Sequence, residues 1–445
     1  MMLRGIVLRM LLLTPLTVAF CYHLAWAQTL LEKTFQVAAE SEVLLDLTAT
    51  APGTSWVESG REAAVVTIFV DGRYHQDVIL FGASRTFTYP LMLGRLVPGT
   101  HSLRVDYNRK QSAAKASIVE IKDTKITAVD KSQAEYQALA LAPFIYARTN
   151  TIGRFSDAPL LPWYEVEHGP SGTTIRYSII FTNEDGGTQT NALMARWGRT
   201  TDIEMIYEAQ IDAQGKLVSS IFQAKDHKNL NFRGRTEADH PLFIVATDNN
   251  MFSDNGQSEM RFALRPIPFD LSHASREELM YQHPWTYQLM ADELQRENKI
   301  SESGRVGQQI ADPRRYLYVQ SGAEQQDTAM SFAVKLKGDP KWYTSDIGIN
   351  YYKVDRSGYF QTTVRLPAGT KIDKIERLAV RCDVAGDPRS WEEISKVANA
   401  QCELTAVKRV FMLDEHYQPG PSLPLHVQPL KLQFGDMIEL YDGRR

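Results

Sequence analysis

The sequence predicts a mostly β, multi-domain protein made of β-sandwiches with short helical segments. Its length of 445 residues allows roughly two to four domains at ~100–200 residues each. Short apolar runs with alternating polar residues recur between turns that contain Gly and Pro, which is typical of antiparallel sandwiches. Helical periodicity is confined to a few short segments, so helices are expected as connections.

Residues 1–27 have the features of a signal peptide. Two arginines precede an apolar run at residues 10–20, and Ala-Trp-Ala at residues 25–27 fits the small-x-small rule for cleavage. We therefore expect an exported protein, either secreted or periplasmic. No later run is long and apolar enough to cross a bilayer, so no transmembrane span is expected after signal removal.

Charge and cysteine content narrow the class of protein further. Residues 1–27 hold two arginines and no acid, so the remaining chain has 47 basic and 53 acidic residues, a formal charge of −6. Nucleic acid is therefore not an expected partner. Cys382 and Cys402 remain, and an even pair in an exported chain predicts a disulfide. The disulfide would close a loop of about twenty residues, worth about 3 kcal/mol.

The first expected domain is an immunoglobulin-like β-sandwich at residues 28–125. Residues 64–70 form a β-branched run that leads into Asp71-Gly72, a hairpin signal. Residues 101–107 alternate polar and apolar side chains, as a half-buried strand does. The Pro-Gly-x-His-x-Leu-x-Val phrase at residues 98–105 resembles a late strand of immunoglobulin-like modules in exported bacterial proteins.

The second expected domain is a central β-sandwich at residues 143–297 with a helical segment at its C-terminal end. Strands are expected at residues 174–181, 201–208 and 242–246, and a polar, glycine-rich turn should join the first two. Capping boxes predict short helices where Ser132 precedes Glu135 and where Ser275 precedes Glu278.

The third expected domain is a C-terminal β-sandwich with one disulfide at residues 313–445. Residues 298–312 are rich in Ser, Gly, Glu and Gln and predict a linker before it. A short helix capped by Ser390 should lie between the two cysteines. Its expected strands are at residues 316–319, 330–334, 359–364, 378–381 and 437–441.

The candidate site begins the second strand of the central domain. Because side chains on a strand alternate faces, one face is expected to hold Asp202, Glu204, Ile206 and Glu208. The other face would hold Ile203, Met205 and Tyr207. Asp202 and Glu204, about 7 Å apart along the strand, form a carboxylate pair that suits glycoside hydrolysis or a shared divalent cation. The competing interpretation is an edge strand with solvated acids.

Further candidate ligands follow in the sequence. His227, next to an acidic residue, completes a candidate metal site with Asp202 and Glu204, and a divalent cation is the cofactor that this set suggests. Asp248 and Asn250 stand at the first and third positions of a calcium-type loop, and an ordinary Asn/Asp turn fits them as well.

Aromatic residues and missing motifs limit the function classes. Trp163, Trp197 and Tyr207 are candidate platforms for sugars, and core packing is the alternative for each. The sequence contains no GxSxG elbow, no phosphate-binding GxxxxGK[ST] loop, no HExxH and no lone mature cysteine. Nucleotide chemistry and Ser or Cys acyl transfer are therefore not expected.

The central segment resembles one known superfamily. A strand reading Ile-x-Tyr-Ser-x-x-Phe, a polar loop and Gly-x-x-x-Asp-x-Glu are similar to the region around the GHRHDWE heptapeptide of the necrosis-inducing cytolysins, and to the HxGDWE segment of a vacuolar-protein-sorting-associated family. The matching residues are Gly198, Asp202 and Glu204. Arg199 and Thr201 replace the two motif histidines. The resemblance spans residues 143–260 and implies a cation that engages sphingolipid head groups.

These observations favour an exported, non-enzymatic binding protein of the cell envelope or secretome. A carbohydrate or a lipid head group is the expected ligand, bound at Asp202, Glu204, His227, Trp197, Asp248 and Asn250. The alternative is a metal-assisted or acid/base hydrolase centred on Asp202 and Glu204.

Overall fold

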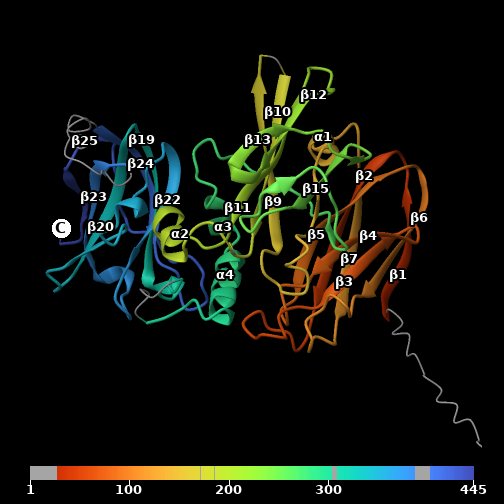
Figure 1. The fold of residues 1–445 in the computed structure, drawn as a ribbon, viewed down its shortest axis with the longest axis horizontal. Coiled ribbons are helices and arrows are strands. Elements are labelled where there is room, and N and C mark those ends of the chain that lie inside the picture. The colour runs from red at the N-terminus through yellow and green to blue at the C-terminus, as the bar shows by residue number, and fades with distance from the viewer. Residues whose placement is uncertain (1–27, 171, 185, 303–307, 386–400, 445) are drawn as a thin grey trace, which may run out of the picture.

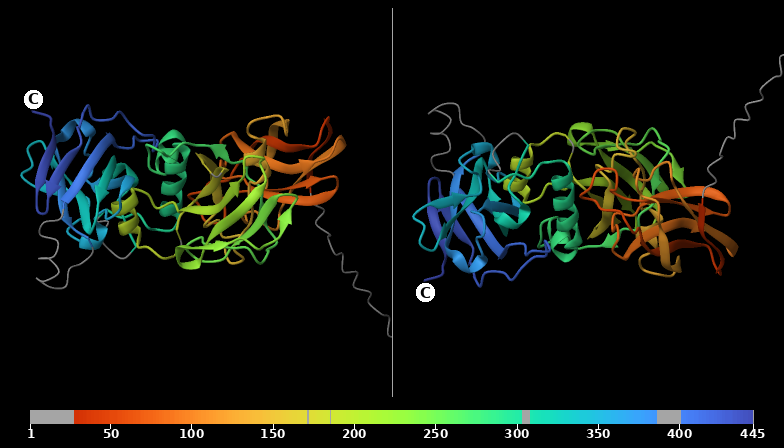
Figure 2. Two further views of the ribbon diagram at one scale, coloured as in Figure 1. Left: turned by 90° about the horizontal axis from the view of Figure 1, so that it is seen from above. Right: turned by 90° about the horizontal axis from the view of Figure 1, so that it is seen from below.

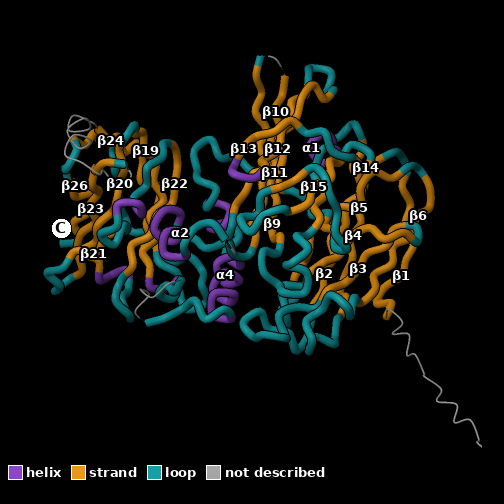
Figure 3. Tube along the Cα trace, in the orientation of Figure 1, coloured by secondary structure: helices purple, strands orange, loops and turns teal. Residues whose placement is uncertain are grey.

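The computed structural model describes residues 28–170, 172–184, 186–302, 308–385 and 401–444. Three β-rich regions lie in a row, with helix α4 (Trp285–Arg296) between the C-terminal region and the others (Figure 1). The views from above and below show the same order (Figure 2). Within the described residues the strands form six sheets, and the helices are few and short (Figure 3). The predicted mostly β, multi-domain fold is confirmed.

The N-terminal region consists of two sheets with strand orders β1-β6-β3-β4 and β5-β2-β7. Side chains of β6 alternate between the core and the surface. His101, Leu103 and Val105 are buried, while the residues between them are half-exposed. Its strands are β1 (Gln28–Val37), β2 (Ser41–Thr50), β3 (Val65–Val70), β4 (Arg73–Ile79), β5 (Phe87–Leu96), β6 (Gly99–Tyr107) and β7 (Glu120–Asp130).

The central region has a six-stranded sheet, β13-β12-β11-β10-β9-β18, and a smaller sheet, β14-β15-β8-β17, with β16 paired to β15. An apolar core between the two sheets includes Tyr177, Tyr207 and Phe243. The strands of the first sheet are β9 (Pro159–Gly169), β10 (Gly172–Phe181), β11 (Ile203–Ile211), β12 (Leu217–Ala224), β13 (Lys228–Asn231) and β18 (Ile267–Pro268). Those of the second are β8 (Phe144–Tyr146), β14 (Thr236–Glu237), β15 (His240–Val245), β16 (Phe252–Ser253) and β17 (Arg261–Phe262).

A bulge in β11 corrects the predicted alternation of faces. Tyr207 pairs with Tyr177 of β10, but Met205 pairs with the adjacent Ser178, so β11 has one extra residue there. Met205 and Tyr207 therefore lie on opposite faces, although they were expected on the same one. Glu204 keeps the core face, whereas Glu208 projects from the other face, where it pairs with Arg176 at 2.7 Å.

The helices also differ from the predicted connections. Where a turn was expected between β10 and β11, the chain forms α2 (Thr190–Trp197). The predicted helices after Ser132 and Ser275 exist as α1 (Tyr136–Ala140) and α3 (Glu278–Gln282), but neither has a side-chain cap. The two capping boxes are therefore wrong, since the N-caps are Glu135 and Glu277, three and two residues later than Ser132 and Ser275. The helix expected at Ser390 lies outside the described residues.

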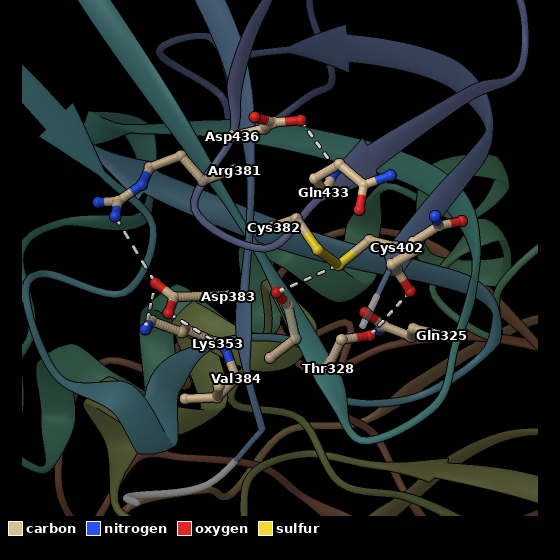
Figure 4. Close-up of a disulfide and its surroundings, with 12 residues drawn as sticks. Gln325, Thr328, Lys353, Arg381, Cys382, Asp383, Val384, Cys402, Gln433 and Asp436 are labelled. Atoms are coloured by element: carbon tan, nitrogen blue, oxygen red, sulfur yellow. Dashed lines mark hydrogen bonds and ion pairs between the residues drawn. A yellow bond between two sulfur atoms is a disulfide. The ribbon is translucent and has the colours of Figure 1, made fainter. Parts of the chain in front are cut away.

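The C-terminal region again has two sheets, β22-β19-β24-β25 and β21-β20-β23-β26. The predicted disulfide is present, and it joins Cys382 of β23 in one sheet to Cys402 of β24 in the other (Figure 4). The strands are β19 (Tyr316–Gln325), β20 (Thr328–Leu336), β21 (Trp342–Thr344), β22 (Gly358–Arg365), β23 (Ile375–Val384), β24 (Gln401–Phe411), β25 (Leu430–Gln433) and β26 (Met437–Asp442).

An apolar core runs from the N-terminal region through α4 into the C-terminal region. Trp56, Leu289 and Tyr318, one from each of these parts, belong to the same buried cluster. The indole of Trp56 also donates a hydrogen bond of 3.0 Å to the buried carboxyl of Glu293 on α4. The expected linker joins this core, because Ile310 is fully buried and bridges to Ile300. Among the described residues, no helix is long and apolar enough to cross a membrane.

The disulfide can be tested by counting free thiols. Because Cys382 and Cys402 are bonded, the denatured, unreduced protein that lacks residues 1–27 should show no free thiol. A variant with both cysteines replaced by alanine should lose about 3 kcal/mol of unfolding free energy. Two titratable thiols, or an unchanged denaturation midpoint in the double variant, would contradict this.

Candidate functional site

The site begins where α2 ends against the C-terminal region. The last carbonyl groups of a helix have no partner within the helix. Here the hydroxyls of Thr363 and Thr362 on β22 donate to the carbonyls of Met194 and Ala195 at 2.6 and 2.5 Å. The end of α2 is therefore fixed by side chains from an edge strand of another sheet, and this end leads directly into the acidic segment.

Gly198 ends α2 in a backbone conformation that favours glycine. Its φ is +65°, and a Cβ atom there would lie 2.8 Å from the Gln361 amide nitrogen and 3.0 Å from the Thr363 methyl group. The Gln361 amide also donates to the Gly198 carbonyl at 3.2 Å. Both the left-handed turn and the close approach of β22 therefore require the missing side chain.

Asp202 and Glu204 are buried at the start of β11, and the alternative of a solvated edge strand is wrong. Their exposed fractions are only 3% and 6%. β11 lies between β10 and β12, and its pairing with β12 begins at Tyr207. The acids face the layer between the two central sheets, where the loop after β15 covers them. Asn250 of that loop, itself fully buried, donates to the Asp202 carboxylate at 2.9 Å.

The two carboxyl groups interact directly. Burial raises the pKa of both, and the charge of Asp202 raises the pKa of Glu204 further. Asp202 accepts a hydrogen bond from Glu204, and this bond lowers the pKa of Asp202. Burial beside Asp202 therefore favours the protonated form of Glu204. A hydrogen-bonded pair is also closer than the two separated carboxyl groups that glycosidases use, at ~5–9.5 Å.

Glu184 is a third carboxyl group at this site. Burial, followed by the charge of Asp202, raises its pKa to about 7. The Thr188 amide donates to its carboxylate at 2.7 Å and offsets part of that rise. Glu184 can therefore change charge near neutral pH.

Two arginines balance these acids. Arg199 is buried and donates through Nε to Glu277 at 3.0 Å. It also donates to the Thr201 carbonyl. Arg276 is exposed and reaches the Ile203 carbonyl at 3.4 Å. Both guanidinium groups thus contact backbone carbonyls of the acidic segment.

His227 lies at the rim of the site, in the turn after β12. Its Nδ1 is 3.8 Å from the Glu204 carboxylate and 2.8 Å from the Gln223 amide nitrogen. Its Nε2 is 3.3 Å from the Asn249 amide nitrogen. His227 therefore approaches Glu204, and Asp202 lines the same pocket.

These groups line a pocket of about 200 Å³. Four of the predicted residues, Asp202, Glu204, His227 and Trp197, contribute to the wall. Asn250 supports Asp202 from behind. The lining residues are Glu184, Thr188, Leu193, Trp197, Arg199, Asp202, Ile203, Glu204, Gln223, His227, Asn249 and Arg276.

The acidic residues of the predicted calcium-type loop form ion pairs instead of a common site. Asp248 forms an ion pair with Arg148, and Glu259, at the twelfth position of the calcium-type loop, pairs with Lys110, so the residues of such a loop do not converge. The alternative, an ordinary turn, is present, since the Asn250 amide donates to the Thr247 carbonyl at 3.1 Å.

A divalent cation does not fit the residues at this site. Within the described parts of the chain, no three His, Cys, Asp or Glu side chains are grouped so as to hold a metal ion. Both ring nitrogens of His227 contact side-chain amides, those of Gln223 and Asn249. No chemical step is therefore assigned to a metal.

Two of the three aromatic candidates lie in the apolar core, and the third lines the pocket. Trp163 and Tyr207 are buried core residues, so they offer no platform to a sugar. Trp197 does line the pocket, but the guanidinium groups of Arg196 and Arg356 lie 5.1 and 5.2 Å from its ring centre. The protein itself thus occupies part of the Trp197 ring surface.

Sequence reasoning missed Glu184, Arg276 and Asn249. All three reach the pocket from segments outside the acidic strand. Glu184 precedes α2, which was not expected, so its approach had no signal in the alternation pattern. Arg276 precedes the short helix α3, a segment in which the sequence pattern predicted only a helix start.

Comparisons with known proteins add little to this geometry. No protein-family model matches the sequence, and no curated protein matches it. Part of the chain is similar to a GH2 β-galacturonidase from Eisenbergiella tayi, whose crystal structure contains galacturonate, at 13% sequence identity and a TM-score of 0.13. The similarity covers 35% of this chain and 22% of that chain. So low a TM-score supports no conclusion on fold or function.

Substitution of Gly198 tests the contact with β22. Gly198→Ala should destabilise the protein by more than Gly369→Ala, because both glycines have positive φ but a Cβ at position 369 meets no atom within 4 Å. We expect about 1 kcal/mol from backbone strain at position 369 and about 2–3 kcal/mol at position 198. Equal losses in urea denaturation would show that β22 does not constrain this turn.

The pKa of Glu184 predicts a pH-dependent stability. A folded-state pKa of about 7, above the ordinary value of 4.5, means that the folded protein holds this proton more tightly than the unfolded chain. The free energy of unfolding should therefore fall as pH rises from about 4.5 to 7, and the loss is complete above pH 7.

Glu184→Gln should remove that part of the dependence, a gain of about 1–2 kcal/mol over the parent at pH 8 and almost none at pH 4.5. Burial also raises the pKa of Glu293, to about 8, so the comparison must be between parent and variant. Denaturation curves that differ by the same amount at both pH values would contradict the assignment.

Proposed function

We propose that this protein is an exported, non-enzymatic binding protein whose ligand is a carbohydrate. The observation that supports this most strongly is the pocket of about 200 Å³ with carboxyl, guanidinium, imidazole and amide groups in one wall. Its volume is below the ~300–1,000 Å³ usual for drug-sized ligands, so it suits a single ring-sized unit. The disulfide between sheets and the signal-like residues 1–27 support export.

The chemistry of the wall suits hydroxyl groups. A sugar hydroxyl both donates and accepts hydrogen bonds, so it needs both kinds of partner. Arg276 and Arg199 offer donors, the Asp202 carboxylate offers acceptors, and a protonated Glu204 offers both. Because these groups are held by α2, β11 and their neighbours, little reorganisation is needed on binding.

Charge favours an uncharged sugar over a lipid head group. Glu184, Asp202 and Glu204 would oppose a phosphate, and the raised pKa of Glu204 lowers the negative charge beside Arg199 and Arg276. The resemblance to the necrosis-inducing cytolysins implies a cation and a sphingolipid head group, and it stays a prediction.

An acid/base hydrolase is the second candidate, and the pKa of Glu184 is the observation that favours it. A carboxyl group with a pKa of about 7 can donate a proton at neutral pH and recover it. The Asp202–Glu204 pair could then serve as the second catalytic carboxyl group, on the opposite side of the sugar ring. Release of reducing ends from bound oligosaccharide, lost in Glu184→Gln while binding persists, would establish this alternative.

Calorimetry with uncharged mono- and oligosaccharides tests the binding proposal. The parent should bind at least one of them, and Arg276→Ala should weaken binding about tenfold, which is the loss of ~1.4 kcal/mol expected for a charged donor. Arg61→Ala, at an exposed arginine of the N-terminal region, should bind as the parent does.

Glu204→Gln provides a second check, because glutamine resembles a protonated carboxyl group in having a donor and an acceptor. It should retain affinity, whereas Glu204→Ala should not. A parent that ignores every uncharged sugar but binds phospholipid vesicles would overturn the carbohydrate proposal.

A further inference from the structure

The acid pocket lies at one end of a longer groove. Next to it is a hollow of about 580 Å³ that shares Gln223, His227 and Arg276 with it. A third hollow, of about 790 Å³, shares Glu165, Arg176 and Leu271 with the second and no residue with the acid pocket. The three hollows therefore form a row, and the acid pocket ends it.

The floor of the middle and outer hollows is the outer face of the six-stranded sheet, whereas Asp202 and Glu204 of the acid pocket lie on the core face. Cross-strand pairing places Glu165, Arg176 and Glu208 in one row on β9, β10 and β11, and the next row holds Glu167 and Thr174. This is the face opposite to the apolar core. Residues 268–272 line the outer hollow and residues 274–276 the middle one, so one segment forms the wall along the groove.

The charge of the groove selects against anions. Glu165, Glu167 and Asp270 line the outer hollow, and the Arg176 guanidinium there is already paired with Glu208 at 2.7 Å. Two arginines, Arg176 and Arg276, line the middle and outer hollows. Of these two, Arg276 also lines the acid pocket. A polyanion would therefore meet an excess of carboxylates along the floor.

An unsatisfied hydroxyl in the middle hollow points to a ligand independently of charge. Ser275 lines this hollow and is 8% exposed. Its hydroxyl has no hydrogen-bond partner among the described residues, although the sequence suggested that it would cap α3. A buried polar group without a partner costs free energy, so a ligand or a bridging water is expected to satisfy it.

We propose that the groove binds the chain of an uncharged oligosaccharide whose end unit enters the acid pocket. This rests on the proposed function, and it adds that the ligand is a chain, that one end of the chain is recognised, and that chains of uronic acids are rejected. Polar side chains on the floor and on the wall face the chain from both sides, and the row of hollows sets its direction.

Calorimetric titration with uncharged oligosaccharides of one to six units tests the proposal. The affinity of the parent should rise at least tenfold between one unit and the longer chains, and oligogalacturonate of equal length should show no such gain. Thr174→Trp, which fills the outer hollow far from the acid pocket, should abolish the gain and leave the affinity for the single unit unchanged. Thr88→Trp, at an exposed residue of the N-terminal sheet, should keep the gain.

The possible results separate the two proposals. If the single unit binds but affinity does not rise with length, or if Thr174→Trp keeps the full gain, the groove proposal is overturned and the acid pocket stands. A uronate chain that binds better than the uncharged one also overturns it. If no uncharged sugar of any length binds the parent, both proposals fail. Unchanged binding of the single unit shows that Thr174→Trp is folded.

Discussion

The site depends on the hydrogen bonds from β22 to the last carbonyl groups of α2. Thr362 donates to the Ala195 carbonyl, Thr363 adds a second donor to the Met194 carbonyl beside the Gly198 amide, and Gln361 donates to the Gly198 carbonyl. This contact also covers an open edge strand of the C-terminal sheet. Because the chain leaves Gly198 straight into the acidic segment, the C-terminal region sets the position of Asp202 although it contributes no side chain to the pocket.

Burial of the acids follows from that placement. Two carboxyl groups at the start of a strand are ordinarily exposed to water, and there both can be ionised without sharing a proton. Here the loop that carries Asn250 covers Asp202 from the smaller sheet, so ionisation of both acids is costly. The pocket can then offer donors and acceptors together at nearly neutral charge, which is the property that a sugar requires and a cation does not.

Much of the fold and part of the site could be predicted from the sequence. Strand periodicity located β10, β11 and β15 and placed Asp202 beside Glu204, and the cysteine count predicted the disulfide. The bulge that turns Glu208 away could not be predicted, because it depends on the register with β10. Nor could α2, whose end is stabilised by residues more than 160 positions away. Glu184 was missed for the same reason, since tertiary contacts bring it to the pocket.

The most direct test of this account is a crystal structure of the protein with an uncharged oligosaccharide bound. The account predicts that the end unit lies in the pocket, within hydrogen-bond distance of Glu204 and Arg276, and that the chain continues over Arg176 toward Thr174. A sugar found away from β11, or a metal ion coordinated by Asp202 and Glu204 together, would contradict it.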